Sequence, residues 1–295
     1  MITIRELQRM EEMRPLVDMQ AVIWGYSDPY PARLFYVVAQ IGGQVLGAYH
    51  GYELVGLALM FYGCREGKAV LHSQLVGVLP AHRNTNIGFQ LKLAQRQFAL
   101  RSGIPIIEWT FDPLQAKNAY LNVHKLGAIV RRYLPNYFGA ISGHYNIGIE
   151  TDRVCAEWYV SSGRVSYCVD GQQGPPQGEC GRALASAKVS GLLPALDERS
   201  LPDPRSPPIV LSNCALVEVP AAFEDLLQMP DRAEAWRLGL RDKLVSSFHD
   251  GYGIVDVQTM KTWSGRRVWY RLEPFQESLS GEMPSSAPYV DGLGI

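Results

Sequence analysis

The stretch from Gln74 to Lys92 constrains the fold most, because its pattern is that of a buried strand joined to a helix by a short polar loop. The apolar run of residues 75–79 ends at Pro80, and the loop Arg-Asn-Thr-Asn-Ile-Gly occupies residues 83–88. A strand that feeds directly into a helix predicts an α/β protein.

The helix predicted after this loop has two distinct faces. Lys92 and Arg96 fall on the face expected to meet water, opposite an apolar stripe formed by Ile87, Leu91, Ala94 and Phe98. The first N–H groups of a helix lack intrahelical partners, and the helix dipole adds partial positive charge at that end. With the guanidinium of Arg83 nearby, this end suits a phosphate group. An ordinary strand-to-helix connection has the same pattern. The local chemistry therefore leaves two interpretations open, a phosphate site and a simple connection.

The composition predicts a globular protein without a strong electrostatic field. Of the 295 residues, 47% are apolar, enough for the core of one large domain or two modest ones. The net charge of −1 gives no general attraction for nucleic acid or an anionic membrane. The charged start lacks the apolar segment of a secretory signal, and no apolar run approaches the ~20 residues of a membrane helix. We therefore expect a cytoplasmic protein that binds neither nucleic acid nor membrane.

The cysteines predict no disulfide framework and no metal site. They are scattered, odd in number and never arranged as C-x-x-C: Cys64, Cys155, Cys168, Cys180 and Cys214. Reduced thiols are the expected state, and no flanking pattern supports a nucleophilic cysteine.

Residues 1–160 are predicted to form one domain with the element order β-α-α-β-β-β-α-β-α-β-β. The expected strands cover residues 2–7, 44–50, 53–62, 69–79, 105–111, 128–133 and 145–150, and the expected helices cover residues 10–24, 32–41, 87–101 and 112–127. Residues 152–160 are expected to add one more strand, with Trp158 buried.

The second half is predicted to hold a linker and a smaller α/β unit. Residues 161–208 are dense in proline and glycine, which favours a linker or a clasp across the first domain. Residues 209–273 regain regular patterns, including a long helix from Pro230 whose charged side chains, Arg237 among them, are expected to face water. A unit of this size is expected to pack on the first domain or across a homodimer, and residues 274–295 form a polar tail.

The segment P-x-x-R-N-x-N-I-G, residues 80–88, resembles the acyl-CoA-binding motif of the GNAT N-acyltransferase superfamily, which runs Gln/Arg-x-x-Gly-x-Gly/Ala. Arg83 and Gly88 match this motif, and Asn86 stands where the middle glycine is usual. Asn is the residue besides glycine that best tolerates a positive φ. The element order is that of a GNAT domain over roughly residues 1–150, and the W-T-F-D-P-L segment from Trp109 resembles a long subgroup, with an extra C-terminal unit, associated with N-acylamino acid metabolism.

The resemblance implies acetyl-CoA or another acyl-CoA as cosubstrate. It assigns the pyrophosphate to Arg83, Asn84, Thr85, Asn86, Ile87 and Gly88. It assigns the pantetheine to Val76 and Val78, one of whose N–H groups would polarise the thioester carbonyl, and to Asn118 at the start of the next helix. Asn118 is also suited to capping that helix, and both interpretations stay open.

A base is required because an amine with a pKa near ~10 is mostly protonated at neutral pH. Glu108 lies inside an apolar strand, where a carboxylate is unexpected unless it is paired or faces a cavity. His72 precedes the pantetheine contacts on their strand, and an imidazole titrates near neutrality. Asp112 is a further candidate, although it also suits a helix cap. Glu108 is the first choice and His72 the second.

The general acid that would protonate the leaving thiolate is harder to identify from the sequence. GNAT helices usually carry a tyrosine four residues before a terminal glycine, and counting back from Gly127 gives Val123. Tyr120 is our candidate substitute, with Tyr133 as a second. Alternatively the thiolate leaves unaided, since a thiol pKa near ~8.5 makes it a tolerable leaving group.

Two features are predicted to bind substrate. Arg131, next to Arg132 at a strand, suits a bidentate carboxylate contact, although a solvated cation has the same pattern. Trp24, Tyr26 and Tyr30 lie in a loop that covers the acceptor site in the family.

The first hypothesis for function is a transferase that moves an acetyl or succinyl group from CoA to the amine of a small molecule, with an amino acid as the expected acceptor. The second is a non-catalytic, CoA-binding regulatory protein, motivated by Asn86 and Val123. The third is a GNAT-fold scaffold that binds no CoA.

Overall fold

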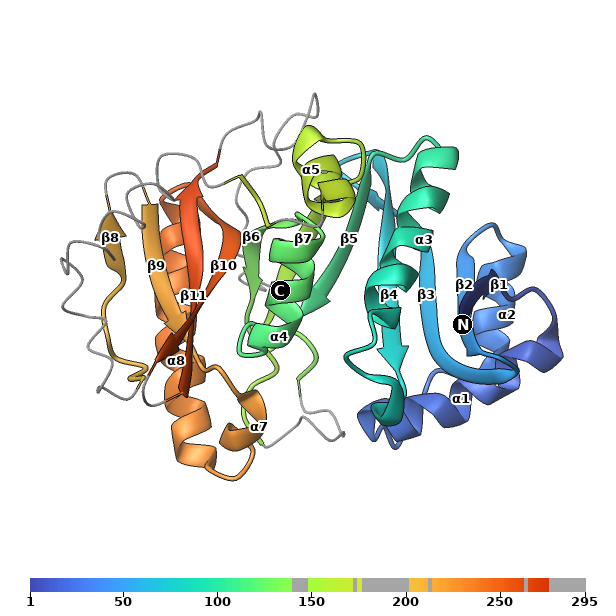
Figure 1. Cartoon of the computed structure of the whole chain (residues 1–295), viewed down its shortest axis with the longest axis horizontal. Coiled ribbons are helices and arrows are strands. Elements are labelled where there is room, and N and C mark those ends of the chain that lie inside the picture. The colour runs from blue at the N-terminus through green and yellow to red at the C-terminus, as the bar shows by residue number, and fades with distance from the viewer. Residues whose placement is uncertain (140–147, 172–173, 177–201, 212–213, 263–264, 276–295) are drawn as a thin grey trace. The chain divides into compact units, whose positions relative to one another are not determined.

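The computed structural model describes residues 1–139, 148–171, 174–176, 202–211, 214–262 and 265–275 (Figure 1). Its contacts divide the chain into two compact units, residues 1–109 with 141–146, and residues 110–140 with 147–295. Residues 110–140 and 147–160, which the sequence pattern places in the first domain, therefore group with the C-terminal part.

The first unit is a sheet in the order β1-β2-β3-β4-β5, antiparallel except for the parallel pair β4/β5. Its elements match the expected order: β1 (Ile2–Glu6), α1 (Met10–Trp24), α2 (Ala32–Gln40), β2 (Gln44–His50), β3 (Glu53–Arg65), β4 (Lys68–Val78), the 3-10 turn η1 (Pro80–His82), α3 (Ile87–Arg101) and β5 (Ile106–Phe111), which ends just beyond the boundary. The predicted α/β class and the predicted order of elements are confirmed for this part of the chain.

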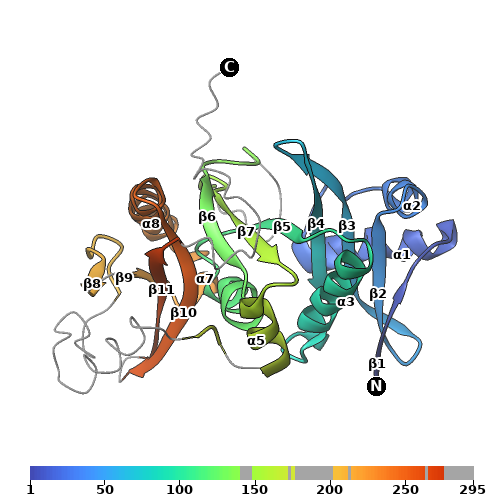
Figure 2. The same ribbon diagram turned by 90° about the horizontal axis from the view of Figure 1, so that it is seen from above.

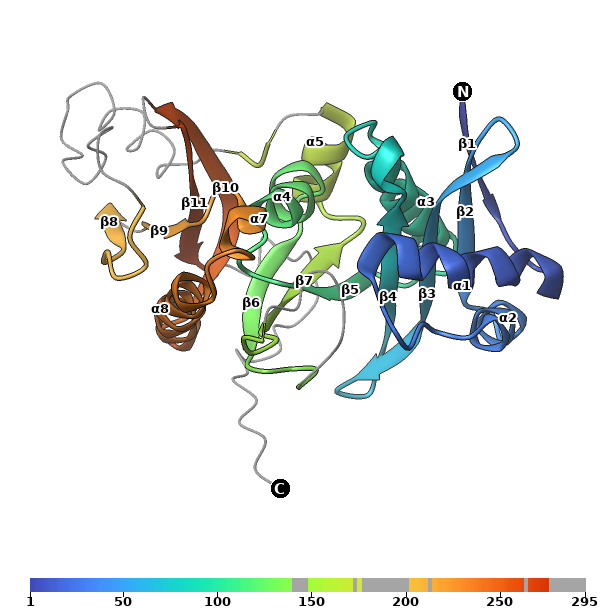
Figure 3. The same ribbon diagram turned by 90° about the horizontal axis from the view of Figure 1, so that it is seen from below.

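Helices cover both faces of this sheet (Figures 2 and 3). On one face Leu57 and Leu59 of β3 join a core with α1 and α2. On the other, Ala58 packs with Ile87 and Leu91 of α3. Successive residues of a strand point to opposite faces, so β3 supplies both cores.

The buried face of α3 includes two cations, which corrects the expectation that they meet water. Lys92 is 3% exposed and Arg96 is 9% exposed. The Lys92 ammonium donates a hydrogen bond to Ser73 Oγ at 2.9 Å and lies 3.4 Å from the ring centroid of Trp109. The helical period identified the stripe at Ile87 and Leu91, but it did not reveal polar partners on β4 and β5.

The second unit has the strand order β7-β6-β10-β11-β9-β8. Its elements are α4 (Ala116–Ala119), the π-helix η2 (Tyr120–Lys125), β6 (Ile129–Leu134), β7 (Arg153–Tyr159), α5 (Gly163–Gly171), β8 (Ile209–Leu211), β9 (Cys214–Val219), α7 (Phe223–Leu226), α8 (Pro230–His249), β10 (Tyr252–Thr262) and β11 (Gly265–Pro274). Strand β10 pairs with β6 at Ile254 and Val130. The predicted unit of residues 209–273 therefore shares one sheet with β6 and β7.

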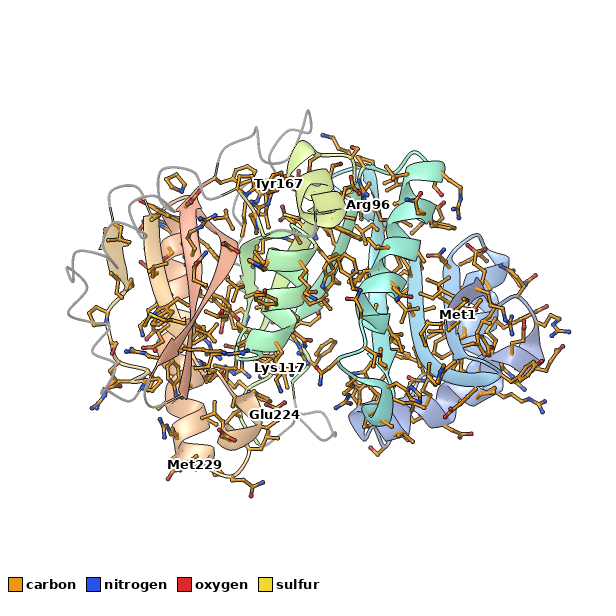
Figure 4. The ribbon with its side chains drawn as sticks, in the orientation of Figure 1. Met1, Arg96, Lys117, Tyr167, Glu224 and Met229 are labelled. Carbon is orange, nitrogen blue, oxygen red and sulfur yellow. The ribbon has the colours of Figure 1, made fainter. Side chains whose placement is uncertain are left out.

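Buried ion pairs fix helix α8 within this unit. Arg237 is 2% exposed, and its two terminal nitrogens donate to Asp112 at 2.8 and 2.7 Å. This corrects the prediction that Arg237 faces water and makes Asp112 a structural residue. At the surface, Lys117 and Glu224 form an ion pair of 3.1 Å (Figure 4).

Several predicted boundaries differ from the structure. Of the strand predicted at residues 145–150, residues 148–150 are not a strand and residues 145–147 lie outside the described residues. The additional strand predicted at residues 152–160 is confirmed as β7. Trp158 is fully buried in β7, as predicted. Helix α5 lies inside the range 161–208 predicted as a linker, whereas residues 177–201 and the tail from residue 276 are outside the described part. Within the described residues, no helix is long and apolar enough to cross a membrane.

Candidate functional site

A β-bulge in β4 sets the geometry of the candidate site. The β3/β4 register runs from Leu59↔Leu75 to Met60↔Ser73, which leaves Gln74 as the extra residue. The parallel pairs between β4 and β5 are Leu71↔Ile107 and His72↔Glu108. A bulge bends its strand and increases the twist. Pairing with β5 therefore stops where the bulge begins, and within the described residues β4 has no paired strand on that side from Gln74 onward.

The backbone of Val76 and Val78 faces this unpaired side. The N–H of Leu79 donates to Val55 O at 2.9 Å, which makes residue 79 a hydrogen-bonded partner of β3. In an antiparallel ladder such residues alternate with residues whose N–H and C=O point the other way. Residues 77 and 75 therefore bond to β3, and the N–H groups of Val76 and Val78 point away from it. These are the two residues predicted to contact pantetheine.

The loop after β4 leads directly into the N-terminus of α3. Asn84 and Asn86 both have positive φ, 63° and 68°. Asn86 thus adopts the positive φ that asparagine was predicted to tolerate, and it is the N-cap of α3. No side chain caps this helix end within the described residues, so its first N–H groups stay available to an anion. Thr85 Oγ1 donates to His82 O at 2.5 Å and stiffens the loop.

Arg83 is held against the backbone rather than extended over the loop. Its Nε donates to Val78 O at 3.4 Å and a terminal nitrogen donates to Ile23 O at 3.3 Å. Its charge therefore remains between the end of β4 and the end of α1.

The aromatic loop between α1 and α2 packs onto β4, on the face opposite α3. A Cβ on Gly77 would lie 2.7 Å from the Trp24 ring, so this glycine is what lets the indole reach the strand. Trp24 stacks on Tyr26 with ring centroids 5.6 Å apart. The Tyr30 hydroxyl accepts a hydrogen bond from Gln74 Nε2 at 2.8 Å. The structure thus places Tyr30 at the bulge and Trp24, with Tyr26 stacked on it, at Gly77.

The two candidate bases lie side by side on β4 and β5. His72 Nε2 is 3.0 Å from Gln74 Oε1, which links the imidazole through Gln74 to Tyr30. Glu108 is 3% exposed and pairs with Arg65 at 2.6 Å. A carboxylate was expected at this buried position only if it is paired or faces a cavity. The ion pair with Arg65 fulfils the first condition.

The remaining helix candidates belong to the second unit. Asn118 is exposed and donates to Gln115 Oε1 at 2.7 Å. Tyr120 opens the π-helix η2 and stacks on His124, with ring centroids 4.4 Å apart. His124 Nδ1 is 2.7 Å from the fully buried carboxylate of Asp256. Asp256, from the C-terminal part of the chain, thus orients His124, whose ring stacks on the predicted acid Tyr120.

Arg131 binds a carboxylate of its own chain. It is 3% exposed and donates to Glu157 at 3.1 and 2.6 Å, and its guanidinium lies 3.9 Å from the ring centroid of Phe275. A buried arginine paired in this way has a structural role. This corrects the assignment of Arg131 to substrate. Tyr133 is likewise fully buried, with its hydroxyl donating to Asp152.

Four neighbours of the site were missed by the sequence analysis: Gln74, Gly77, Lys92 and Trp109. A glycine inside a strand is a signal of close backbone approach and would have pointed to Gly77. The bulge at Gln74 and the burial of Lys92 have no signal in the periodicity. One shallow pocket of the first unit lies elsewhere, lined by Thr3, Arg5, Tyr49, Gly51 and Tyr52, none of them a predicted site residue.

Comparison with protein-family models and with curated proteins gave no match. Solved structures did match. A putative acetyltransferase of Salmonella typhimurium, yncA, solved with acetyl-CoA, is 19% identical with a TM-score of 0.44, covering 54% of this chain and 94% of its own. The ribosomal-protein-S18-alanine N-acetyltransferase of Escherichia coli is 13% identical with a TM-score of 0.44, and the match covers 55% of this chain and 95% of that one. An N-acetyltransferase of Staphylococcus aureus is 15% identical with a TM-score of 0.45, and the match covers 55% of this chain and 99% of that one.

Proposed function

We propose that this protein is an acyl-CoA-dependent N-acyltransferase of the GNAT type. It would move an acetyl or succinyl group from CoA to the amine of a small molecule, in the first place an amino acid, by direct transfer in a ternary complex. The observation that carries the proposal is the bulged strand β4, whose unpaired edge leads through the Asn86-capped loop into α3.

This arrangement suits the two chemically different ends of CoA. The pantetheine arm carries amides, which can bond to the outward backbone groups at Val76 and Val78. The pyrophosphate is a dianion, which matches the free N–H groups and the positive dipole end of α3 at Ile87 and Gly88. The other loop residues, Arg83, Asn84, Thr85 and Asn86, and the exposed Asn118, remain proposed CoA contacts.

Three steps of chemistry follow. An N–H of Val76 or Val78 would stabilise the oxyanion formed when the amine attacks the thioester carbonyl. His72 is the preferred base because it is joined to Gln74 at the bulge, while Glu108 is held by Arg65 and is the alternative. Tyr120, stacked on the His124–Asp256 pair, is the proposed acid toward the leaving thiolate. The acceptor would lie under the aromatic loop of Trp24 and Tyr26.

The alternative is a CoA-binding protein without catalysis, which one observation favours. Val123, at the position of the family's tyrosine, is fully buried and carries no proton to donate. In this case CoA would bind at the same loop, and no acyl group would leave it.

One experiment separates the two functions. The protein is incubated with acetyl-CoA or succinyl-CoA and a panel of amino acids and polyamines, and free thiol is followed. Thiol release that requires both the CoA ester and an amine supports the enzyme. Thermal stabilisation by CoA without release supports the sensor, and neither effect at millimolar CoA would exclude both.

The base is tested by comparing His72→Gln with Glu108→Gln. If His72 accepts the proton, His72→Gln abolishes the rise of rate with pH and Glu108→Gln keeps it. The opposite outcome makes Glu108 the base.

A further inference from the structure

Three potential metal ligands meet at one end of the first unit: His50, Glu53 and His82. One ligand atom from each lies within 4.8 Å of the other two, and His82 Nε2 is 3.8 Å from Glu53 Oε2. The rings of His50 and His82 have centroids 5.7 Å apart and an interplanar angle of 69°. An ion pair between Glu53 and His82 would account for two of these side chains but not for His50.

The backbone brings the three together. His50 and Glu53 are paired across the two-residue turn that closes the β2/β3 hairpin, so their side chains lie on one face. The pair Gly56↔Val78 and the Leu79–Val55 hydrogen bond hold the end of β4 beside the start of β3. The turn η1, which carries His82, follows at once and therefore lies next to the hairpin.

We infer that these side chains form a site for a divalent first-row transition metal such as Zn²⁺. Two imidazoles and a carboxylate suit Zn²⁺, Co²⁺ or Ni²⁺, whereas Mg²⁺ and Ca²⁺ prefer oxygen ligands alone. Zn–N and Zn–O bonds of about 2.0–2.2 Å place tetrahedral ligand atoms roughly 3.4 Å apart. The distances between the three atoms must therefore shorten by up to about 1.4 Å, which side-chain rotation of the exposed His50 and Glu53 allows. The fourth position is left to water.

The metal would have a structural consequence for the nearby loop. By linking the β2/β3 hairpin to η1, it fixes the segment that leads into residues 83–88. The site does not depend on the proposed acyltransfer, because its ligands are outside the residues assigned to CoA or to catalysis.

The test uses the full chain without a polyhistidine tag, in a Cys64→Ser background that removes an exposed thiol. Zn²⁺ binding is measured by calorimetry, Co²⁺ binding by visible absorption, and folding by circular dichroism. His50→Ala and His82→Ala are compared with His249→Ala, an exposed histidine at the end of α8 whose side chain is 82% exposed.

We expect one equivalent of Zn²⁺ in the parent and in His249→Ala. His50→Ala and His82→Ala should each lose at least the roughly 10-fold affinity that even outer-shell partners of a metal contribute. Zn²⁺ should also slow amide exchange in residues 50–53 and 81–82 of the parent. Absence of binding at about 100 µM Zn²⁺, or unchanged affinity in both His50→Ala and His82→Ala, would overturn the assignment.

Discussion

The buried amine of Lys92 predicts a specific pH dependence of stability. Lys92 is 3% exposed, with one hydrogen bond to Ser73 Oγ and the face of Trp109 as its contacts, and no ion pair to it is found in the described residues. Burial lowers the pKa of Lys92 well below 10.5. The folded protein therefore holds this amine neutral at pH values where the unfolded chain protonates it.

The sign and size of the effect follow from proton linkage. Between the folded-state pKa and about 10.4, the unfolded state binds one more proton, so Lys92 makes stability rise with pH by about 1.4 kcal/mol per unit. As pH falls through this window, that stability is lost. Lys92→Met removes the term, so within this window the difference between Lys92→Met and the wild type should shrink by about 1.4 kcal/mol for each unit by which the pH rises.

The assay is urea unfolding followed by tryptophan fluorescence at several pH values. Lys68→Met, at the exposed start of β4, is the matched control, and its difference from the wild type should be independent of pH. Taking differences cancels the other titrating groups. If Lys92→Met and the wild type keep a constant difference over the same range, Lys92 is charged in the folded state and the reasoning is refuted.

Three further changes have defined outcomes. Arg237→Met strands the buried carboxylate of Asp112 and should cost about 3–5 kcal/mol in urea unfolding, with Asp112→Asn in the same chain restoring part of the loss. Gly77→Val drives a side chain into Trp24, which should cost about 1–3 kcal/mol and shift the tryptophan emission; unchanged emission would contradict the packing. Asn86→Ala places a Cβ-bearing residue without asparagine's tolerance at φ 68° and should cost about 1–2 kcal/mol, while Asn86→Gly should not destabilise the protein.

The local elements were predictable because their patterns are strong. The helical period located α1 and α3, alternation and a two-residue turn located the β2/β3 hairpin, and the loop chemistry anticipated the positive φ of Asn86. These features depend on residues close in sequence. The α/β class of the fold followed from them.

What the sequence did not reveal depends on partners distant along the chain. Lys92, Arg131 and Arg237 were all expected to be accessible, yet each is buried beside a residue that no periodicity identifies. The sharing of one sheet by β6 and β10 likewise joins residues 124 positions apart (Val130 and Ile254). Cysteine spacing carries no signal for a cluster of His50, Glu53 and His82, because these residues come together only through the β2/β3 hairpin and η1.

Binding of acetyl-CoA to the loop before α3 tests the central claim most directly. Calorimetric titration compares the wild type with Gly88→Trp, which fills the N-terminus of α3, and with Gly163→Trp, a control at the exposed start of α5 where a Cβ meets nothing within 4 Å. The proposed site predicts one equivalent bound by the wild type and by Gly163→Trp, and none by Gly88→Trp. Equal binding by all three proteins, or no binding by the wild type at millimolar acetyl-CoA, would contradict it.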